Sequence, residues 1–393
     1  MEEKTEPALV MSKPVFVNTH NIISPLGISS KENFEAILKG SSGVKLQDRK
    51  DIDDESFYAS LIENKRLYDV AGIDQADNNY TCFEVLLIAS LQEALKESSV
   101  NITDEKTILI FSTTKGNIAL LENNEATPEL LERISLFHSA KLVAQKFKNP
   151  NTPIVISNAC ISGIAALMFA KRLLITGAYE NAVVIGADTI TKFVFSGFKS
   201  FRALSDNRCK PFSADRDGIN LGEAAATIIL TTTQNSSNNI QLKGAATSND
   251  ANHISGPSKT GDELSMAINT ILSEANIAAN EIDFISAHGT ATLFNDEMEA
   301  KAFHSSALFD VPINSLKGYF GHTLGAAGLI ESVIGLMSLE NGVIVPTLGF
   351  TTLGVPVAAN ICREPIHKSM RSFLKTASGF GGCNGAVVFS KVD

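Results

Sequence analysis

The sequence lacks the features that mark several classes of protein. Its five cysteines are odd in number and form no CxxC pair and no Cys/His spacing, so neither a disulfide framework nor a zinc site is indicated. No apolar run reaches the roughly 18 residues that a membrane-spanning helix needs. The first ten residues, MEEKTEPALV, place acids before any apolar stretch, which is unlike a secretory signal. These absences favour a protein of the reducing cytoplasm that holds no metal and sits in no membrane.

A surplus of positive charge is also missing. Lysine and arginine number 33 against 43 acidic residues, which gives a net charge of -10 and a pI of about 5.3. This balance argues against nucleic acid or an anionic membrane as the main partner, although a local basic patch could still dock an acidic protein. With 44% hydrophobic and 19% charged residues, the 393-residue chain predicts a large folded core of one or two domains.

Short apolar strands alternate with helical patterns along the whole chain, which predicts an α/β fold with a parallel or mixed sheet covered on both faces. The clearest break in composition is TTTQNSSNNIQ, at 231–241, and the pattern of strands and helices repeats after it. We therefore expect a duplicated fold with one half at 1–234 and the other at 235–393. The strand-like and helical segments that carry this expectation are PVFVNTHNII, CFEVLLIASLQEAL, TILIFSTT, PIVISN, AVVIGAD, ATIILTT, LSMAINTILSEA, DFISAHG, NDEMEAKAFHSS, PINSLKG, LGAAGLIESVIGLMSLENG, FLKTASGF and AVVFSKV.

Cys160 stands between the predicted strand PIVIS and a predicted apolar helix that begins at Ile161. A free cysteine is often only a small buried hydrophobe. At a strand-to-helix elbow, however, the helix N-terminus offers partial positive charge and free N–H groups, and both favour a thiolate. The position therefore predicts a nucleophile.

Two of the seven histidines also follow strand-like segments. His288 lies in SAHGTATLFNDEMEA and His322 lies in NSLKGYFGHTLGAAG. Ligands collect at the carboxyl ends of strands in α/β sheets. Either histidine alone could be structural, but together with a cysteine at an elbow they predict a catalytic set.

Six segments together make the chain resemble a β-ketoacyl-acyl carrier protein synthase of the Cys-His-His type, within the thiolase-like superfamily. The resemblance implies a layered α-β-α-β-α architecture, with a cap region at about 30–150 in the first half and both histidines in the second. It also implies a decarboxylative Claisen condensation between malonyl-carrier protein and an acyl chain held on Cys160. The six segments, in order, are KENFEAILKGSSGV after the SPLG turn, NACISG, RALSDNRCKPFSADRDGINLGE, AHGTATLFND, NSLKGYFGHTLGAAG and GFGGCNGA.

The resemblance assigns roles near the nucleophile. It implies that neutral His288 and His322 donate N–H groups to the enolate oxygen. It implies that the backbone N–H groups of Cys160 and Phe380 form an oxyanion hole, with Phe380 also acting as a gate. Glycines in GFGG would let the chain approach the sulfur closely.

Further residues are assigned in the same way. The resemblance implies that Lys317 is buried near the site and pairs with Glu299 in support of the histidines, because a buried lysine is costly unless paired. It implies that Thr290 and Thr292 bind the phosphopantetheine arm that carries the substrates. No bound cofactor and no metal are expected.

Acyl carrier protein is the expected partner. Because carrier proteins are acidic, as this chain is, a local basic patch must guide docking. The residues that we expect in it are Lys65, Arg66, Arg202, Arg208 and Lys210. The resemblance also implies a dimer, formed either with a second copy or with a related chain-length partner subunit.

Three departures from the family pattern favour a specialised acyl or polyene chain, such as an aryl polyene, over housekeeping lipid synthesis. Cys383 stands where threonine is more usual, STTKGN replaces a glycine-rich turn, and LKGYFGHT differs from the sequence most common in the family at that motif.

Two other interpretations of the function stay open. A degradative thiolase would use Cys383 as a second catalytic cysteine, and a non-condensing chain-length subunit would lack the nucleophile that Cys160 provides.

Overall fold

The computed structural model describes residues 13–77, 79–234, 239–252 and 256–392. Among these residues, ten strands form one mixed sheet in the order β11-β10-β14-β15-β9-β1-β8-β6-β4-β5. The ladder pair Phe16–Gln241 and the hydrogen bond from the N–H of Leu242 to the carbonyl of Val15 (2.9 Å) join its two five-stranded halves. The strands are β1 Phe16–Ile23, β4 Thr107–Ser112, β5 Ile154–Ile156, β6 Asn181–Asp188, β8 Ala224–Thr231, β9 Ile240–Asn249, β10 Phe284–Ser286, β11 Ile313–Asn314, β14 Ser372–Gly379 and β15 Cys383–Lys391.

The two halves have the same topology. From the outer edge inward, the first half reads β5-β4-β6-β8-β1 and the second reads β11-β10-β14-β15-β9. In both, the three outer strands are mutually parallel and the two inner strands run antiparallel to their neighbours. This repeat confirms the duplicated α/β fold. The expected boundary between 234 and 235 stays a prediction because 235–238 lie outside the described residues, as does the N-terminal segment 1–12.

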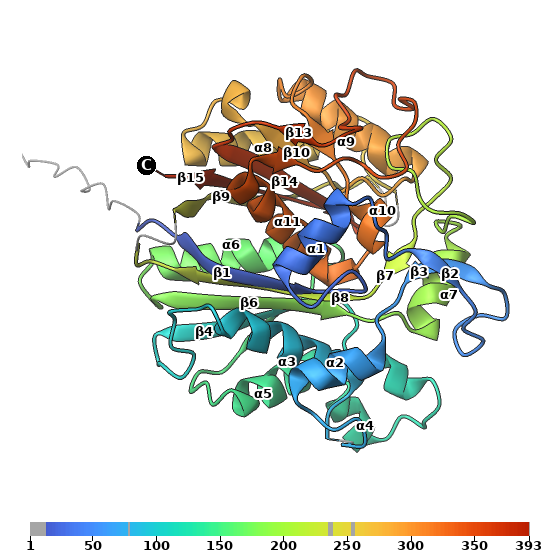
Figure 1. The fold of residues 1–393 in the computed structure, drawn as a ribbon, viewed down its shortest axis with the longest axis vertical. Coiled ribbons are helices and arrows are strands. Elements are labelled where there is room, and N and C mark those ends of the chain that lie inside the picture. Colours follow the sequence, from blue (N-terminus) through green and yellow to red (C-terminus); the bar gives the residue numbers. More distant parts are fainter. Residues whose placement is uncertain (1–12, 78, 235–238, 253–255, 393) are drawn as a thin grey trace, which may run out of the picture.

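Helices and half-sheets alternate in five layers (Figure 1). Helices α6 and α11 form the middle layer, because each packs against strands of both halves. Helix α3 packs on the outer face of the first half, where α5 also lies, and α8 covers the outer face of the second half with α9 beside it. The helices are α1 Ser30–Leu38, α2 Asn64–Ala71, α3 Cys82–Leu95, α4 Pro128–Arg133, α5 Leu136–Lys146, α6 Ser162–Ile175, α7 Lys192–Ser200, α8 Asp262–Ala275, α9 Leu293–Ser305, α10 Lys317–Phe320 and α11 Ala327–Asn341.

The sequence explains the middle layer. Helices α6 and α11 are apolar on nearly every side, and a helix of this kind is stable only when it is buried all round. Helix α3 begins as predicted at Cys82, where Thr81 and Glu84 form a capping box that satisfies two backbone donors.

Smaller elements were not predicted. Strands β2 Lys45–Gln47, β3 Phe57–Ser60 and β7 Leu221–Gly222 form a separate sheet, and β12 Val343–Ile344 pairs with β13 Ile366–His367. Each has only two to four residues, so its periodic pattern is weak, although strands as short were expected at β5, β10 and β11. Single 3₁₀ turns occur at η1 Ile118–Leu121, η2 Ala279–Glu281 and η3 Leu324–Ala326. In the described part of the chain, no helix combines the length and the apolar character needed to cross a bilayer.

Candidate active site

Cys160 lies on the elbow that connects β5 to α6. Ala159 holds a left-handed backbone conformation, with φ of +43°, which is uncommon for a residue with a side chain and marks a sharp turn. The Ser162 hydroxyl fixes this turn by donating to the carbonyl of Ala159 (2.6 Å) and accepting from the N–H of Asn158 (2.8 Å). The cysteine is 7% exposed and precedes the helix by two residues, as the sequence predicted to within one residue.

His288 follows β10, and a buried carboxylate holds its loop. The carboxylate of Glu299 on α9 accepts hydrogen bonds from the backbone N–H groups of His288 (2.8 Å) and Gly289 (2.6 Å). It also accepts from the hydroxyl of Thr376 on β14 (2.9 Å) and from the amide of Asn295 (3.1 Å). Glu299 therefore has four donors and serves to position the histidine-bearing loop.

His322 precedes η3 and α11, so it occupies in the second half the place that Cys160 occupies in the first. Its backbone N–H donates to the carbonyl of Asn220 (2.7 Å), and its carbonyl accepts from Gly222 (3.0 Å). Three residues later, the N–H of Gly325 donates to the buried carboxylate of Asp188, which ends β6 (2.8 Å). The first half thus holds the loop that carries this second histidine.

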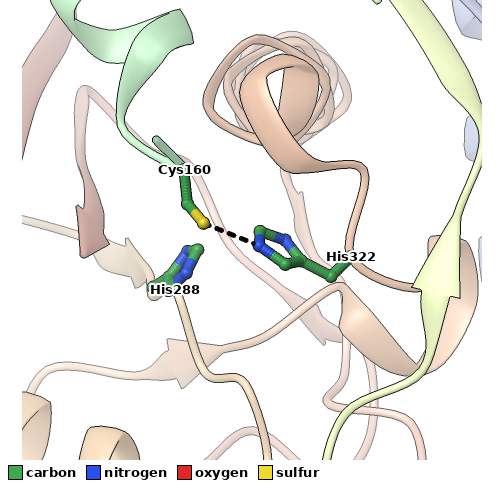
Figure 2. Close-up of side chains that lie close together, drawn as sticks. All are labelled: Cys160, His288 and His322. Carbon is green, nitrogen blue, oxygen red and sulfur yellow. Dashed lines mark hydrogen bonds between the residues drawn. The ribbon is translucent and has the colours of Figure 1, made fainter. Parts of the chain in front are cut away.

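The three side chains converge on one point (Figure 2). The sulfur of Cys160 lies 3.0 Å from Nε2 of His322. The rings of His288 and His322 stand edge to face with centroids 5.2 Å apart, and a nitrogen of each lies with the sulfur inside a 4.8 Å span. The structure therefore brings together the cysteine and both histidines that the sequence singled out.

The site keeps all three groups neutral. Burial raises the pKa of the Cys160 thiol to about 12, and the backbone N–H of Phe380, which bonds to the sulfur, opposes this only in part. Burial, followed by the positive charges of Lys317 and Lys375, lowers the pKa of both His288 and His322 well below its ordinary value. The sequence analysis expected the helix N-terminus to favour a thiolate, and desolvation acts in the opposite direction as the largest effect on the pKa of Cys160. The thiol can instead pass its proton to an imidazole as it reacts.

Lys317 is buried as expected, but its expected partner is wrong. Its ammonium group pairs with Glu331 on α11, while Glu299 accepts hydrogen bonds from two backbone N–H groups of the histidine loop and from the side chains of Thr376 and Asn295. Glu331 also pairs with Lys375 on β14, whose Nζ lies 2.6 Å from Oε2. The sequence analysis missed both residues. Two features of the sequence could have indicated them, since charges in buried elements must be paired. These are the single glutamate in the apolar helix LGAAGLIESV and the single lysine in the strand FLKTASG.

The GFGG segment passes directly beside the sulfur. A side chain at Gly379 would place its Cβ 3.0 Å from the backbone nitrogen of Cys160 and 2.9 Å from the sulfur of Cys383, so only glycine fits there. This close approach lets the N–H of Phe380 reach the Cys160 sulfur. Both N–H groups expected in the oxyanion hole thus lie at the nucleophile.

A cavity of about 530 Å³ leads to the three residues. Thr290 and Thr292 line it, and their hydroxyls lie 2.8 Å apart. Thr292 precedes α9 but makes no side-chain capping bond, which leaves its hydroxyl available to a ligand. Phe380 lines the cavity between the rings of Phe198 (5.7 Å) and Phe201 (5.3 Å). The sequence analysis missed Phe198 and Phe201, because α7 carries no distinctive pattern.

The expected docking residues are exposed or half-exposed, but they do not all lie at the cavity. Arg202 lines it, directly after α7, whereas the other four do not. Lys65 and Arg66 lie on α2, where Arg66 pairs with Glu32 (2.9 Å). Arg208 donates to the carbonyl of Val44 (3.3 Å), and Lys210 pairs with Asp215. The structure thus brings one of the five to the cavity mouth.

Comparison with known families accounts for most of the chain. The family model described as "Beta-ketoacyl synthase, N-terminal domain" matches residues 12–236, and the one described as "Beta-ketoacyl synthase, C-terminal domain" matches 240–351. Among curated proteins, the chain is similar to a putative mitochondrial 3-oxoacyl-[acyl-carrier-protein] synthase of Schizosaccharomyces pombe, with 29% identity over 96% of this chain and 99% of the relative. It is 27% identical to 3-oxoacyl-[acyl-carrier-protein] synthase 2 of Staphylococcus aureus, over 97% of this chain and 99% of the relative.

Solved structures share the fold. A ketosynthase (ApeO) in complex with its chain length factor (ApeC) from Xenorhabdus doucetiae superposes with a TM-score of 0.84 at 23% identity, covering 99% of this chain and 100% of that one. The ishigamide ketosynthase/chain length factor superposes with a TM-score of 0.85 at 23% identity, covering 97% of this chain and 100% of that one.

Proposed function

The chain belongs to the β-ketoacyl synthase family, and we propose that it extends an acyl chain held on Cys160 by one decarboxylated malonyl unit delivered on acyl carrier protein. Members of this family are acyltransferases. The observation that carries the assignment of roles is the contact between the Cys160 sulfur and Nε2 of His322, with His288 beside them in a buried pocket.

Loading is the first step. The thiol of Cys160 attacks the acyl thioester as its proton passes to the imidazole of His322, 3.0 Å away. The N–H groups of Cys160 and Phe380 hold the oxyanion of the tetrahedral intermediate. When the intermediate collapses, the phosphopantetheine thiolate leaves and takes up that proton. His322 is then neutral again for the next substrate.

Decarboxylation follows. The malonyl thioester loses CO₂, and the electron pair of the broken C–C bond becomes an enolate. His288 and His322 are neutral, so each can donate one N–H to the enolate oxygen. Donors of this kind are typically worth about 3 kcal/mol each in the transition state. Thr290 and Thr292 hold the phosphopantetheine arm along the cavity.

Condensation completes the cycle. The enolate carbon attacks the thioester carbon on Cys160, and the two backbone N–H groups hold the oxyanion a second time. The C–S bond then breaks, which leaves a β-ketoacyl chain on the carrier protein and returns the thiolate of Cys160, which takes up one proton from solvent to restore the thiol. The leaving thiolate is stabilised by the same hydrogen bond from Phe380.

The direct test is to incubate the chain with an acyl-carrier protein labelled on its acyl group and to locate the label by mass spectrometry of peptides. We expect the label on Cys160 and, after malonyl-carrier protein is added, on a product two carbons longer. Label on Cys383 would support a thiolase-like mechanism instead. Absence of label with retained binding would support a non-condensing chain-length subunit.

We also propose that the chain serves a specialised polyene or polyketide pathway in the cytoplasm, as a dimer with itself or with a chain-length subunit. The departures at STTKGN, LKGYFGHT and Cys383 support the pathway, and the five free cysteines support a reducing compartment. The outer strand β5 supports a dimer, since its three apolar residues are half-buried at an unpaired sheet edge among the described residues. Bound acyl chains identified by mass spectrometry after purification test the pathway.

A further inference from the structure

A buried group of three charges lies behind the two histidines. Lys317 and Lys375 both pair with Glu331, and all three side chains are at most 4% exposed. Two lysines share this carboxylate. Burial lowers the pKa of Lys375, and the attraction of Glu331 and of the nearby buried Glu299 opposes that shift. A buried charge is costly, and a second buried lysine therefore needs a reason beyond pairing the glutamate.

The contacts of Lys375 connect it to His288. Its Nζ donates to the carbonyls of Ser286 and Ala287, both at 3.0 Å, and these are the two residues that directly precede His288. Strand β14, which carries Lys375, lies parallel to β10 with Lys375 opposite Ser286. The lysine thus holds the end of the strand from which the His288 loop departs.

The same group also connects to His322 and to the oxyanion hole. Lys317 lies five residues before His322 at the start of α10, and Glu331 lies on α11, the helix that follows His322. Lys375 itself lies on the strand that leads to Gly379 and Phe380. This buried ion group therefore contacts or lies next to the His288 loop, the segment of His322 and the strand that leads to Phe380. It does not contact the Cys160 elbow.

We propose that Lys375 is a positioning residue that holds the His288 and His322 imidazoles in a fixed relative position and adds a second positive charge close to both rings. This inference rests on the proposed function, because it concerns how the two histidines act as neutral donors. Lys375 does not line the cavity, so it acts through the histidines and not on the substrate.

The positive charge of Lys375 affects the pKa of the two histidines in one direction. A positive charge makes protonation of a nearby imidazole harder, so Lys375 acts together with burial and Lys317 to lower the pKa of both histidines. Removal of this charge raises the imidazole pKa. The acid limb of the decarboxylation rate must then move to higher pH, because a protonated imidazole attracts the carboxylate of the malonyl group and so stabilises the substrate against loss of CO₂.

The test uses Lys375→Met and Lys375→Gln in the full chain. Either change leaves the Lys317–Glu331 pair intact, and glutamine keeps an N–H donor without the charge. We expect kcat for malonyl-carrier protein decarboxylation to fall roughly a hundredfold in the Met variant, as small displacements of catalytic groups cause, with KM unchanged. In both variants the acid limb should move to higher pH, with part of kcat restored by glutamine.

A matched control is Lys171→Met. Lys171 is 7% exposed on α6 and pairs with Glu274, but it contacts neither histidine loop. This variant should keep the wild-type kcat and pH profile. If the Met variant does not fold, the Gln variant carries the test. An unchanged acid limb in the folded variants overturns the inference, even when kcat falls, because a merely structural lysine would lower kcat without moving the limb.

A second readout separates this inference from the proposed function. The ring protons of His288 and His322 can be followed by NMR during a pH titration without any substrate. Lys375→Met should raise the pKa of both rings, whether or not the wild-type chain releases CO₂. Failure of decarboxylation in the wild type would overturn the proposed function, whereas unchanged ring titration in the variant would overturn the role of Lys375.

Discussion

Replacement of Glu299 by alanine tests the geometry of the His288 loop. The change removes one carboxylate and leaves two backbone N–H groups and the Thr376 hydroxyl without that acceptor, while the Asn295 amide keeps only its bond to Asp296. Hydrogen bonds to a charged group are each worth about 1.5–3 kcal/mol. The losses do not simply add, and removal of a buried charge recovers part of its desolvation cost. We therefore expect the free energy of unfolding to fall by about 3–5 kcal/mol, which is close to values for broken buried pairs.

Such a loss leaves a folded protein if the wild type has ordinary stability, which runs from about 5 to 15 kcal/mol. The histidine loop, however, no longer has the carboxylate of Glu299 to hold its backbone N–H groups. A shift of about 1 Å in a catalytic group lowers the rate about a hundredfold. Urea unfolding and CO₂ release from malonyl-carrier protein measure the two effects. Glu35→Ala is the matched control, since this glutamate on α1 is exposed and its replacement should change stability by at most about 0.5 kcal/mol. Wild-type stability together with wild-type CO₂ release in Glu299→Ala would refute this account of the loop.

Four further outcomes follow from the site. Cys160→Ala should abolish condensation and acyl labelling while the fold persists, and residual condensation at a comparable rate would remove Cys160 as the acyl acceptor. Alanine at His288 or at His322 should strongly reduce CO₂ release yet leave some acylation. Because the imidazole pKa values are lowered, wild-type decarboxylation should decline only as pH falls well below 6.5, and a decline centred at 6.5 would contradict neutral donors held by burial. Arg202→Glu combined with Lys210→Glu should raise KM for carrier protein, and salt should do the same, without changing turnover of a small thioester; insensitivity to both would place docking elsewhere.

The sequence predicted the larger elements and the reacting groups for related reasons. Strands such as AVVIGAD and helices such as CFEVLLIASLQEAL are long enough for their apolar pattern to show, and a cysteine or histidine that follows a strand is chemically conspicuous. The nucleophile and both histidines could therefore be named before the structure was known. The repeat of the two halves could also be inferred from the order of elements.

The supporting contacts could not be predicted in the same way. A sequence shows that Lys317 needs an acidic partner, but Glu299 and Glu331 are both buried glutamates on helices, and only the packing of α11 beside α10 decides between them. The protonation state of Cys160 likewise depends on burial, which a helix N-terminus in the sequence does not report. Pairing and desolvation are tertiary properties, and the expected pair of Lys317 with Glu299 was wrong for that reason.

The middle layer has a consequence for how the chain folds. Helix α6 belongs to the first half and α11 to the second, yet each packs against strands of both halves. Neither half can bury its own central helix, so a newly made first half would leave the apolar sides of α6 open to solvent until the second half had been synthesised. We expect the two halves to fold in one cooperative step, slowed by the many contacts between residues distant in sequence. A chaperone that covers α6 during synthesis would shield the surface that is most prone to aggregation.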